Sequence, residues 1–273
     1  MNSIDFIFIG PSKTASTWIY KALSEHPGCS LPKSKDIYFF DKYFERGFEW
    51  YAAHFDECDN DKVIGEFSHD YILSNEALDR ISQNFKNIKI ILCIRNPFER
   101  TESGVRFLQR NGYGFSELSE LISKHNELVE GSLYAKNLKR VYSRFNNDQV
   151  LILNYEELKS DPKKFLLRIT NFLTVKDFNP SVLHKKVNEA KLARSVKISY
   201  LVKRTALFAR HIGLARLVGM LKMNDFVNRL LYKDDGKKFS LSNDDKELLA
   251  KYFNDDIREL SEITGENYYD WLY

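Results

Sequence analysis

A short apolar run followed by small and hydroxylated residues lies near the start of the chain, in the stretch FIFIGPSKTASTWIYKAL at 6–23. Gly10 and Pro11 end the apolar run, and SKTAST then leads into residues with helical spacing. A loop of this kind presents backbone N–H groups and hydroxyls at a helix N-terminus, where the helix dipole attracts anions. The stretch therefore predicts a phosphate-binding loop.

This loop differs from the G-x-x-x-x-G-K-[ST] pattern of ATP-hydrolysing proteins. Aligned from Gly10, the pattern requires glycine where this chain has Ala15 and lysine where it has Ser16. The lysine of this loop is instead Lys13. The apolar run at 88–94 is followed by Arg95 and not by the aspartate that holds Mg²⁺. ATP hydrolysis is disfavoured, and a kinase with a degenerate loop is kept as one alternative function.

The elements that must position this loop alternate between strand and helix patterns. Buried-type strands are expected at 4–10, 62–68, 88–97 and about 149–154. Helices are expected at 17–26, 74–85 and 161–173, from about 97, 115 and 132, and in a long terminal segment ended by Gly265. This alternation indicates an α/β fold with a central parallel sheet flanked by helices. Ligands in such folds bind where strands end, here at 10–17, 65–71, 95–103 and 153–156.

Composition limits the classes of protein that the chain can represent. Its 273 residues are 43% hydrophobic, which suits one large domain over 1–273, or at most two small ones. A net charge of +3 is too small to indicate a nucleic-acid partner. The three cysteines have no metal-type spacing, and no signal peptide or run of roughly 20 apolar residues is present. We expect a cytoplasmic protein.

One stretch is strongly basic. Residues 191–222 contain eight lysines and arginines and no acidic residue. The wider region 191–235 could form a basic lid or an acceptor-binding helix, and 191–222 could also contact an anionic membrane or face only solvent. A peripheral membrane or polyanion-binding protein with a non-catalytic nucleotide fold is therefore a second alternative.

Several segments resemble, in order and spacing, those of the PAPS-dependent sulfotransferases, most closely the heparan-sulfate-type and bacterial members. The segments are GPSKTASTW (10–18), KDIYFFD (35–41), GFEWYAAHF (47–55), GEFSHDYIL (65–73), RNPFERTESG (95–104), GSLYAKNLKRVYSRF (131–145), VLILNYEELKSDP (150–162) and VNEAKLARS (187–195). The resemblance implies a P-loop NTPase-like sulfotransferase fold and a bacterial source. It also implies PAPS (3′-phosphoadenosine 5′-phosphosulfate) as donor, adenosine 3′,5′-bisphosphate as product, and no metal.

The same resemblance assigns cofactor-binding roles. Residues matching the family's phosphosulfate loop are Ser12, Lys13, Thr14, Ala15, Ser16 and Thr17. Lys13 would stabilise the charge that develops on the departing phosphate oxygen only as the bond breaks. Residues matching the rest of the nucleotide site are Trp18 for adenine, Arg95 and Ser103 for the 3′-phosphate, and Lys191 and Arg194 in a basic closing loop. The alternatives are a core position for Trp18 and a helix-start ion pair for Arg95.

Two residues compete for the role of the base that takes the acceptor's proton. Asp36 falls on the glutamate of the K-E-x-x-F-F segment, although its side chain is one methylene shorter. His69 stands where relatives have proline, and an imidazole titrates near neutral pH. A helix N-cap for Asp36 and an ordinary loop position for His69 are the alternatives. Glu66 matches the glutamate of the E-K-S-P segment.

The resemblance predicts in-line sulfuryl transfer to an acceptor hydroxyl of a carbohydrate, a glycolipid or a small-molecule natural product. Phe67 stands where the family's E-K-S-P segment has lysine, which removes a positive charge on the substrate side. This difference weakens the case for a highly sulfated glycan. The sequence alone does not separate the acceptor classes.

Overall fold

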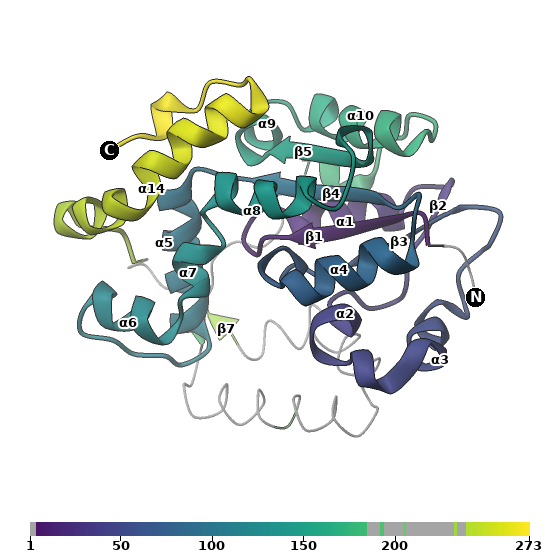
Figure 1. Cartoon of the computed structure of the whole chain (residues 1–273), viewed down its shortest axis with the longest axis horizontal. Coiled ribbons are helices and arrows are strands. Elements are labelled where there is room, and N and C mark those ends of the chain that lie inside the picture. Colours follow the sequence, from purple (N-terminus) through teal and green to yellow (C-terminus); the bar gives the residue numbers. More distant parts are fainter. Residues whose placement is uncertain (1–3, 185–191, 194–204, 206–231, 234–238) are drawn as a thin grey trace. The chain divides into compact units, whose positions relative to one another are not determined.

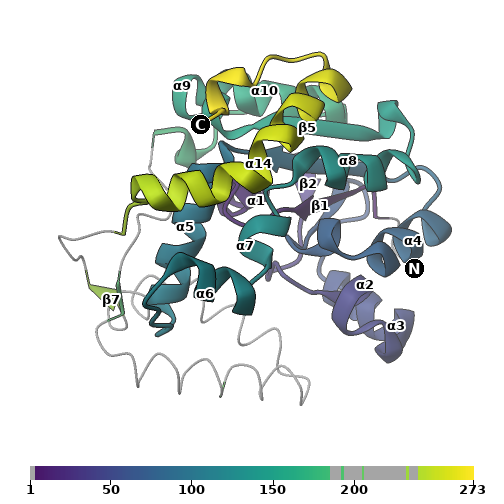
Figure 2. The same cartoon turned by 60° about the vertical axis from the view of Figure 1, so that its left-hand side comes forward.

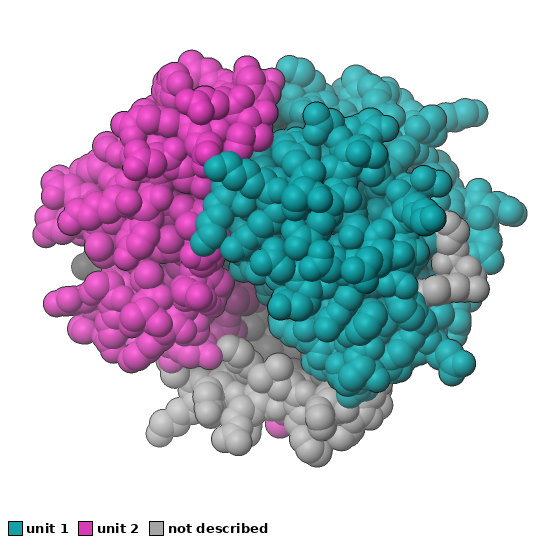
Figure 3. Space-filling model, in the orientation of Figure 1, with its two compact units in different colours: residues 1–96, 134–188 teal, residues 97–133, 189–273 magenta. Residues whose placement is uncertain are grey.

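The computed structural model describes residues 4–184, 192–193, 205, 232–233 and 239–273 (Figure 1). The chain forms two compact units, which are coloured separately in Figure 3. The first comprises Met1–Asn96 and Tyr134–Asn188, and the second comprises Pro97–Leu133 and Glu189–Tyr273.

The first unit contains a parallel sheet of five strands in the order β2-β3-β1-β4-β5. Its strands are β1 (Phe6–Gly10), β2 (Cys29–Ser30), β3 (Val63–Phe67), β4 (Lys89–Ile94) and β5 (Val150–Asn154). Every residue of β1, and every residue of β4 after Lys89, is buried. Continuous apolar runs form such strands because both faces of a parallel sheet are covered by helices. The predicted α/β fold with a parallel sheet is confirmed.

Helices cover both faces of this sheet (Figures 1 and 2). The helices α1 (Ser16–Ser24) and α10 (Pro162–Leu173) share one face, and α4 (Asn75–Asn84) and α8 (Tyr134–Tyr142) share the other. Trp18 of α1 packs edge-on against Phe165 of α10, with ring centroids 5.7 Å apart. Helix α1, which follows β1, and helix α4, which follows β3, therefore lie on opposite faces of the sheet. In parallel sheets ligands bind where the connections diverge to opposite faces, and here that point is at the end of β1.

Local signals set the starts of two helices that the sequence predicts. Ser74 caps α4 by accepting a hydrogen bond from the Ala77 amide at 3.1 Å, and Asp161 caps α10 by accepting one from Lys164 at 2.9 Å. The short elements β2, α2 (Phe39–Lys42), α3 (Gly47–Ala52) and α9 (Tyr155–Ser160) complete the first unit. Single turns of 3-10 helix lie at Phe44–Arg46, Ala53–Phe55, Tyr71–Leu73, Asn147–Gln149, Ser181–His184 and, in the second unit, Tyr269–Trp271.

The second unit is mainly helical where it is described. It contains α5 (Pro97–Arg110), α6 (Leu118–Lys124), α7 (Glu127–Glu130), α14 (Asn243–Thr264) and the antiparallel pair β6 (Leu192–Ala193) and β7 (Tyr232–Lys233). Arg100 is buried and donates hydrogen bonds to the Leu128 carbonyl at 3.1 Å and the Ser132 hydroxyl at 2.9 Å. These contacts give Arg100 a structural role within the second unit. Gly265 ends α14 in the left-handed conformation, as predicted.

Gly10, the last residue of β1, is expected to tolerate no side chain. Its φ is +111°, and an added Cβ would overlap the backbone carbonyl of His69. We expect Gly10→Ala to lower the free energy of unfolding in urea by more than about 3 kcal/mol. Gly265→Ala is the matched control, because φ there is +71° with no heavy atom within 4 Å of the added Cβ, and it should cost about 1 kcal/mol. Equal losses in the two variants would contradict the close approach at Gly10.

Candidate active site

The loop after β1 has a strained and internally bonded backbone. Lys13 and Ala15 have φ values of 70° and 67°, which residues with a side chain rarely adopt. The fully buried Thr14 donates a hydrogen bond from its hydroxyl to the Pro11 carbonyl at 2.6 Å. Strained backbone of this kind persists only where its surroundings hold it, and it concentrates at functional sites.

The first turn of α1 is open to an anion. Its N-cap residue is Ala15, so no side chain caps the helix, and the first N–H groups of a helix have no partner within the helix. Ser12, Lys13 and Thr17 are half-buried around this turn, and Ser16 is buried. A helix N-terminus with a strained loop and an adjacent lysine fits a phosphate or sulfate group.

Arg95 reaches this loop from the neighbouring strand. It follows β4, which pairs with β1, and its guanidinium donates a hydrogen bond to the Lys13 carbonyl at 3.5 Å. The Tyr134 hydroxyl donates to the Arg95 carbonyl at 2.8 Å, and the Arg95 guanidinium carbon lies 4.5 Å from the ring centre of Tyr155. The structure thus brings Arg95 and the predicted phosphosulfate loop together.

Three other predicted nucleotide contacts stay predictions. Ser103 lies half-buried on α5 in the second unit, whereas Arg95 belongs to the first. Lys191 and Arg194 lie outside the described residues. The basic stretch around them is likewise outside, apart from residues 192–193 and 205.

Trp18 occupies a core position in the first unit. Only 7% of it is exposed, and its indole N–H donates to the Val182 carbonyl at 3.2 Å. Together with the Phe165 contact, this is the packing expected for the alternative, a core tryptophan. Stacking of adenine on Trp18 stays a prediction.

The two candidate bases are hydrogen-bonded to each other. Asp36 Oδ1 lies 2.7 Å from His69 Nδ1, and Asp36 is 3% exposed. An ionised Asp36 accepts a hydrogen bond from Nδ1–H, so the lone pair of a neutral His69 is on Nε2. The Tyr38 hydroxyl lies 3.1 Å from that Nε2. The N-cap alternative for Asp36 is wrong, since the residue before α2 is Tyr38 and no side chain caps the helix.

Lys35 is a cation that sequence reasoning did not assign to the site. Its Nζ lies 3.3 Å from the Ser16 hydroxyl and 3.6 Å from Asp36 Oδ1, and its side chain is 11% exposed. Lys35 therefore contacts both the anion-binding turn of α1 and the Asp36–His69 pair. Its place beside Asp36 in the KDIYFFD segment was the only sequence signal.

The carboxyl group of Glu66 accepts hydrogen bonds from three buried hydroxyls. The donors are Tyr51 at 2.5 Å, Ser68 at 2.6 Å and Tyr71 at 2.8 Å. Burial raises the pKa of Glu66 to about 7, although the three hydrogen bonds favour its ionised form. The next residue, Phe67, faces the core and stacks on Phe8 with ring centroids 5.3 Å apart.

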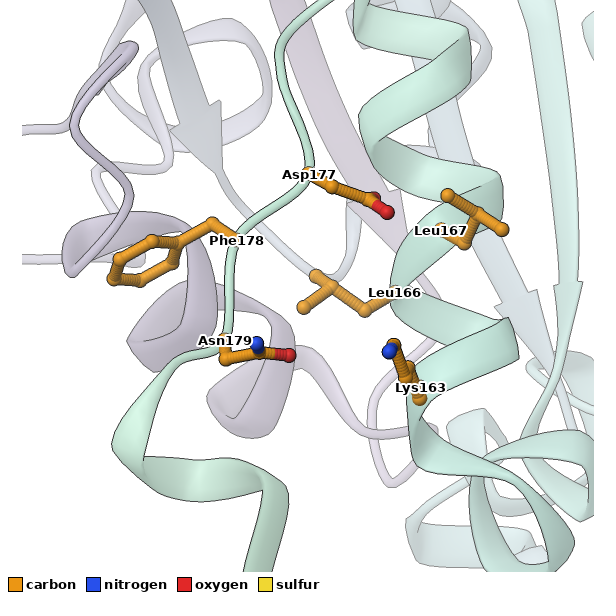
Figure 4. A pocket seen from close by; sticks show the side chains of 6 residues that line it. All are labelled: Lys163, Leu166, Leu167, Asp177, Phe178 and Asn179. Carbon is orange, nitrogen blue, oxygen red and sulfur yellow. The ribbon is translucent and has the colours of Figure 1, made fainter.

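A separate small pocket of about 70 Å³ lies beside α10 (Figure 4). Its lining residues are Lys163, Leu166, Leu167, Asp177, Phe178 and Asn179. None of these belongs to the loop after β1 or to the Asp36–His69 pair. In the part of the chain that the structure describes, no group of three histidine, cysteine or acidic side chains could hold a metal ion.

Comparison with known proteins identifies relatives. The family model described as "Sulfotransferase domain" matches residues 3–254. The membrane-associated sulfotransferase kil1 of Dictyostelium discoideum is 36% identical over 135 residues, covering 46% of this chain and 29% of that protein. The mouse heparan sulfate glucosamine 3-O-sulfotransferase 3B1 is 28% identical over 179 residues, covering 62% of this chain and 46% of that protein. The matches therefore cover less than half the length of either relative.

Solved structures show the same fold. A sulfotransferase from Alicyclobacillus acidocaldarius superposes with a TM-score of 0.73 and 19% identity, covering 99% of both chains. The mouse sulfotransferase SULT7A1 in complex with PAP superposes with a TM-score of 0.51 and 19% identity, covering 93% of this chain and 85% of that one. At this identity the likeness shows the fold alone, and it confirms the predicted P-loop-like sulfotransferase fold.

The raised pKa of Glu66 predicts a pH dependence of stability. Its folded pKa is about 7 against an ordinary value of 4.5, so the folded state binds more protons than the unfolded state between these values. Stability must then fall as pH rises through this window, by at most on the order of 3 kcal/mol. Urea denaturation at pH 4.5 to 8 should show this loss in the wild type and a smaller loss in Glu66→Gln, where Asp41, whose pKa burial raises to about 6, still contributes.

Glu49, an exposed residue of α3, is the control for loss of a carboxylate, because Glu49→Gln should keep the wild-type dependence of stability on pH. Parallel profiles for the wild type and Glu66→Gln would contradict the raised pKa.

Proposed function

Because the chain belongs to the sulfotransferase family, we propose that residues 1–273 form one sulfotransferase domain that transfers a sulfuryl group from PAPS to an acceptor hydroxyl. One observation carries the proposal. The uncapped first turn of α1 and its strained loop adjoin Lys35 and Arg95, beside a hydrogen-bonded Asp36–His69 pair. Anion-binding and proton-accepting groups thus lie together at the end of β1.

The loop fits the anionic end of the donor. The backbone N–H groups of residues 15–17 and the hydroxyls of Ser12, Ser16 and Thr17 would hold the 5′-phosphosulfate. Arg95 would bind the 3′-phosphate, together with Ser103, since a planar guanidinium matches phosphate geometry. Lys191 and Arg194 complete the proposed nucleotide site. PAPS supplies an activated sulfuryl group whose departing partner is a phosphate.

Lys13 has the role of the electrostatic catalyst. As the bond between sulfur and the bridging oxygen breaks, negative charge grows on that oxygen, and the ammonium group stabilises it most at that moment. Lys35, 3.3 Å from the Ser16 hydroxyl, adds a second positive charge on the same side. No metal ion is needed in this scheme, because ammonium groups and loop amides stabilise the charge.

The Asp36–His69 pair has the role of the base. The acceptor oxygen forms its bond to sulfur while its proton moves to His69 Nε2, and the electrons of the breaking S–O bond stay on the phosphate. Asp36 holds Nδ1 protonated and stabilises the imidazolium that results, as a carboxylate does beside a histidine base. In this arrangement Asp36 acts through His69.

The acceptor we propose is a carbohydrate hydroxyl. The name of one relative specifies heparan sulfate glucosamine, and the inward-facing Phe67 offers no charge to a highly sulfated chain. A glycolipid or a small natural product would present the same hydroxyl group.

Membrane contact through 191–222, a bacterial source and a cytoplasmic location all stay predictions. One relative is named membrane-associated, and 191–222 lies largely outside the described residues. No helix among the described residues is both long enough and apolar enough to cross a membrane.

Calorimetric titration with adenosine 3′,5′-bisphosphate tests the nucleotide assignment. We expect micromolar binding by the wild type, a loss of at least tenfold in affinity in Arg95→Ala because a charged hydrogen bond to phosphate is removed, and no binding of ATP with Mg²⁺. Arg258→Ala is the control, because its side chain is 53% exposed on α14. Absence of bisphosphate binding by the wild type would overturn the proposed donor.

Replacement of Lys13 tests the chemical step. We expect Lys13→Ala to fold normally and to lose roughly 10²–10³-fold in kcat, because an interaction made mainly in the transition state is removed. The measurement is transfer of labelled sulfuryl groups from PAPS to desulfated heparan sulfate. Lys33→Ala, whose side chain is 57% exposed, should keep wild-type turnover. Turnover near that of the wild type in Lys13→Ala would exclude this role.

A further inference from the structure

The segment that carries Asp36 is strained and needs support. Asp36 and Tyr38 have φ values of 65° and 55°, each in the left-handed region. Such a residue costs on the order of 1–3 kcal/mol, and it persists only where its surroundings hold it. The question is which groups hold residues 36–40, since the Asp36–His69 hydrogen bond depends on this backbone.

Three backbone N–H groups of the segment donate hydrogen bonds to the last residue of β3 and to the chain that follows it. Asp36 N–H donates to the Phe67 carbonyl at 2.6 Å. Tyr38 N–H donates to the Ser68 hydroxyl at 3.0 Å, and Phe40 N–H donates to the Tyr71 hydroxyl at 3.3 Å. Two of the three supports are therefore hydroxyl groups, which can rotate and can act either as donor or as acceptor.

Glu66 decides which way these hydroxyls point. Ser68 and Tyr71 both donate to its Oε1, at 2.6 and 2.8 Å, and all three side chains are buried. Each hydroxyl has one proton, so donation to Glu66 leaves its lone pairs for the N–H groups of Tyr38 and Phe40. A buried acceptor of this kind polarises the hydroxyls and makes their bonds to the segment stronger.

We infer that Glu66 is a positioning residue that acts on the proposed sulfuryl transfer through Ser68 and Tyr71, by holding the 36–40 backbone that keeps Asp36 on His69. Glu66 itself contacts no substrate, because its side chain is fully buried. The inference rests on the proposed function for its catalytic consequence, and on the hydrogen bonds alone for its structural one.

The third hydroxyl on Glu66 provides a matched control. Tyr51 donates to Oε2 at 2.5 Å and is as buried as Tyr71, and the hydrogen bond described for its hydroxyl is this one to Glu66 and not one to residues 36–40. Tyr51→Phe and Tyr71→Phe therefore remove the same group from the same carboxylate. Only Tyr71→Phe also removes a hydroxyl that supports the 36–40 segment. A general loss of stability should therefore appear in both variants, whereas a positioning effect should appear only in Tyr71→Phe.

The test is the ¹⁵N–¹H NMR signal of His69 Nδ1–H in the labelled full chain. We expect the wild type and Tyr51→Phe to show one protected Nδ1–H tautomer, and Ser68→Ala and Tyr71→Phe to lose it or mix it with the Nε2–H form. Ser68→Ala serves as the second variant because it changes the other support. A wild-type signal in both Ser68→Ala and Tyr71→Phe would overturn the inference.

Kinetics and binding separate this inference from the proposed function. With PAPS and desulfated heparan sulfate, Ser68→Ala and Tyr71→Phe should lose roughly a hundredfold in kcat, as expected for a displaced base, and should approach His69→Gln. Their affinity for adenosine 3′,5′-bisphosphate should equal that of Tyr51→Phe. Equal kcat in Tyr51→Phe and Tyr71→Phe would contradict positioning, whereas a wild type that binds no bisphosphate would contradict the proposed function alone.

Discussion

The parallel pairing of β1 with β3 on one side and with β4 on the other is the constraint on which the candidate site depends. Because parallel strands end at the same edge of a sheet, this pairing places the loop after β1 between His69 and Arg95. Gly10 allows the closest approach, since any side chain there would overlap the His69 carbonyl. Strands that are almost entirely buried therefore position the candidate site residues, and the loops after them set the local conformation of those residues.

Backbone strain concentrates at this edge. Of the five non-glycine residues with positive φ among those described, Lys13, Ala15, Asp36 and Tyr38 belong to the two segments at the site, and Thr174 ends α10. A well-packed parallel sheet can tolerate several such residues because its own stability is spread over many buried side chains. The strain gives a fixed anion-binding turn and a fixed carboxylate, which is the preorganisation that an electrostatic mechanism needs.

Positive and negative groups divide the site between them. Lys35 and Arg95 contact the loop after β1, where an anion would bind, whereas Asp36 and Glu66 lie on the side of His69. Lys35 also lies 3.6 Å from Asp36, so it connects the two halves electrostatically. Asp36 and Glu66 are buried and the Lys35 side chain is only 11% exposed, and such charges are screened by salt far less than surface charges are. A proton acceptor and an anion site can therefore influence each other strongly here.

The sequence by itself determined the alternation of strands and helices, the caps at Ser74 and Gly265, and the order of segments typical of the family. These properties depend on local periodicity or on short motifs, which a single chain displays directly. Only the tertiary structure decided that Asp36 and His69, 33 positions apart, form one pair and not two rival bases. It also decided that Lys35 contacts Ser16 and that Glu66 accepts hydrogen bonds from the hydroxyls of Ser68 and Tyr71. Side-chain pairing between distant loops follows from strand order and register, which no local pattern encodes.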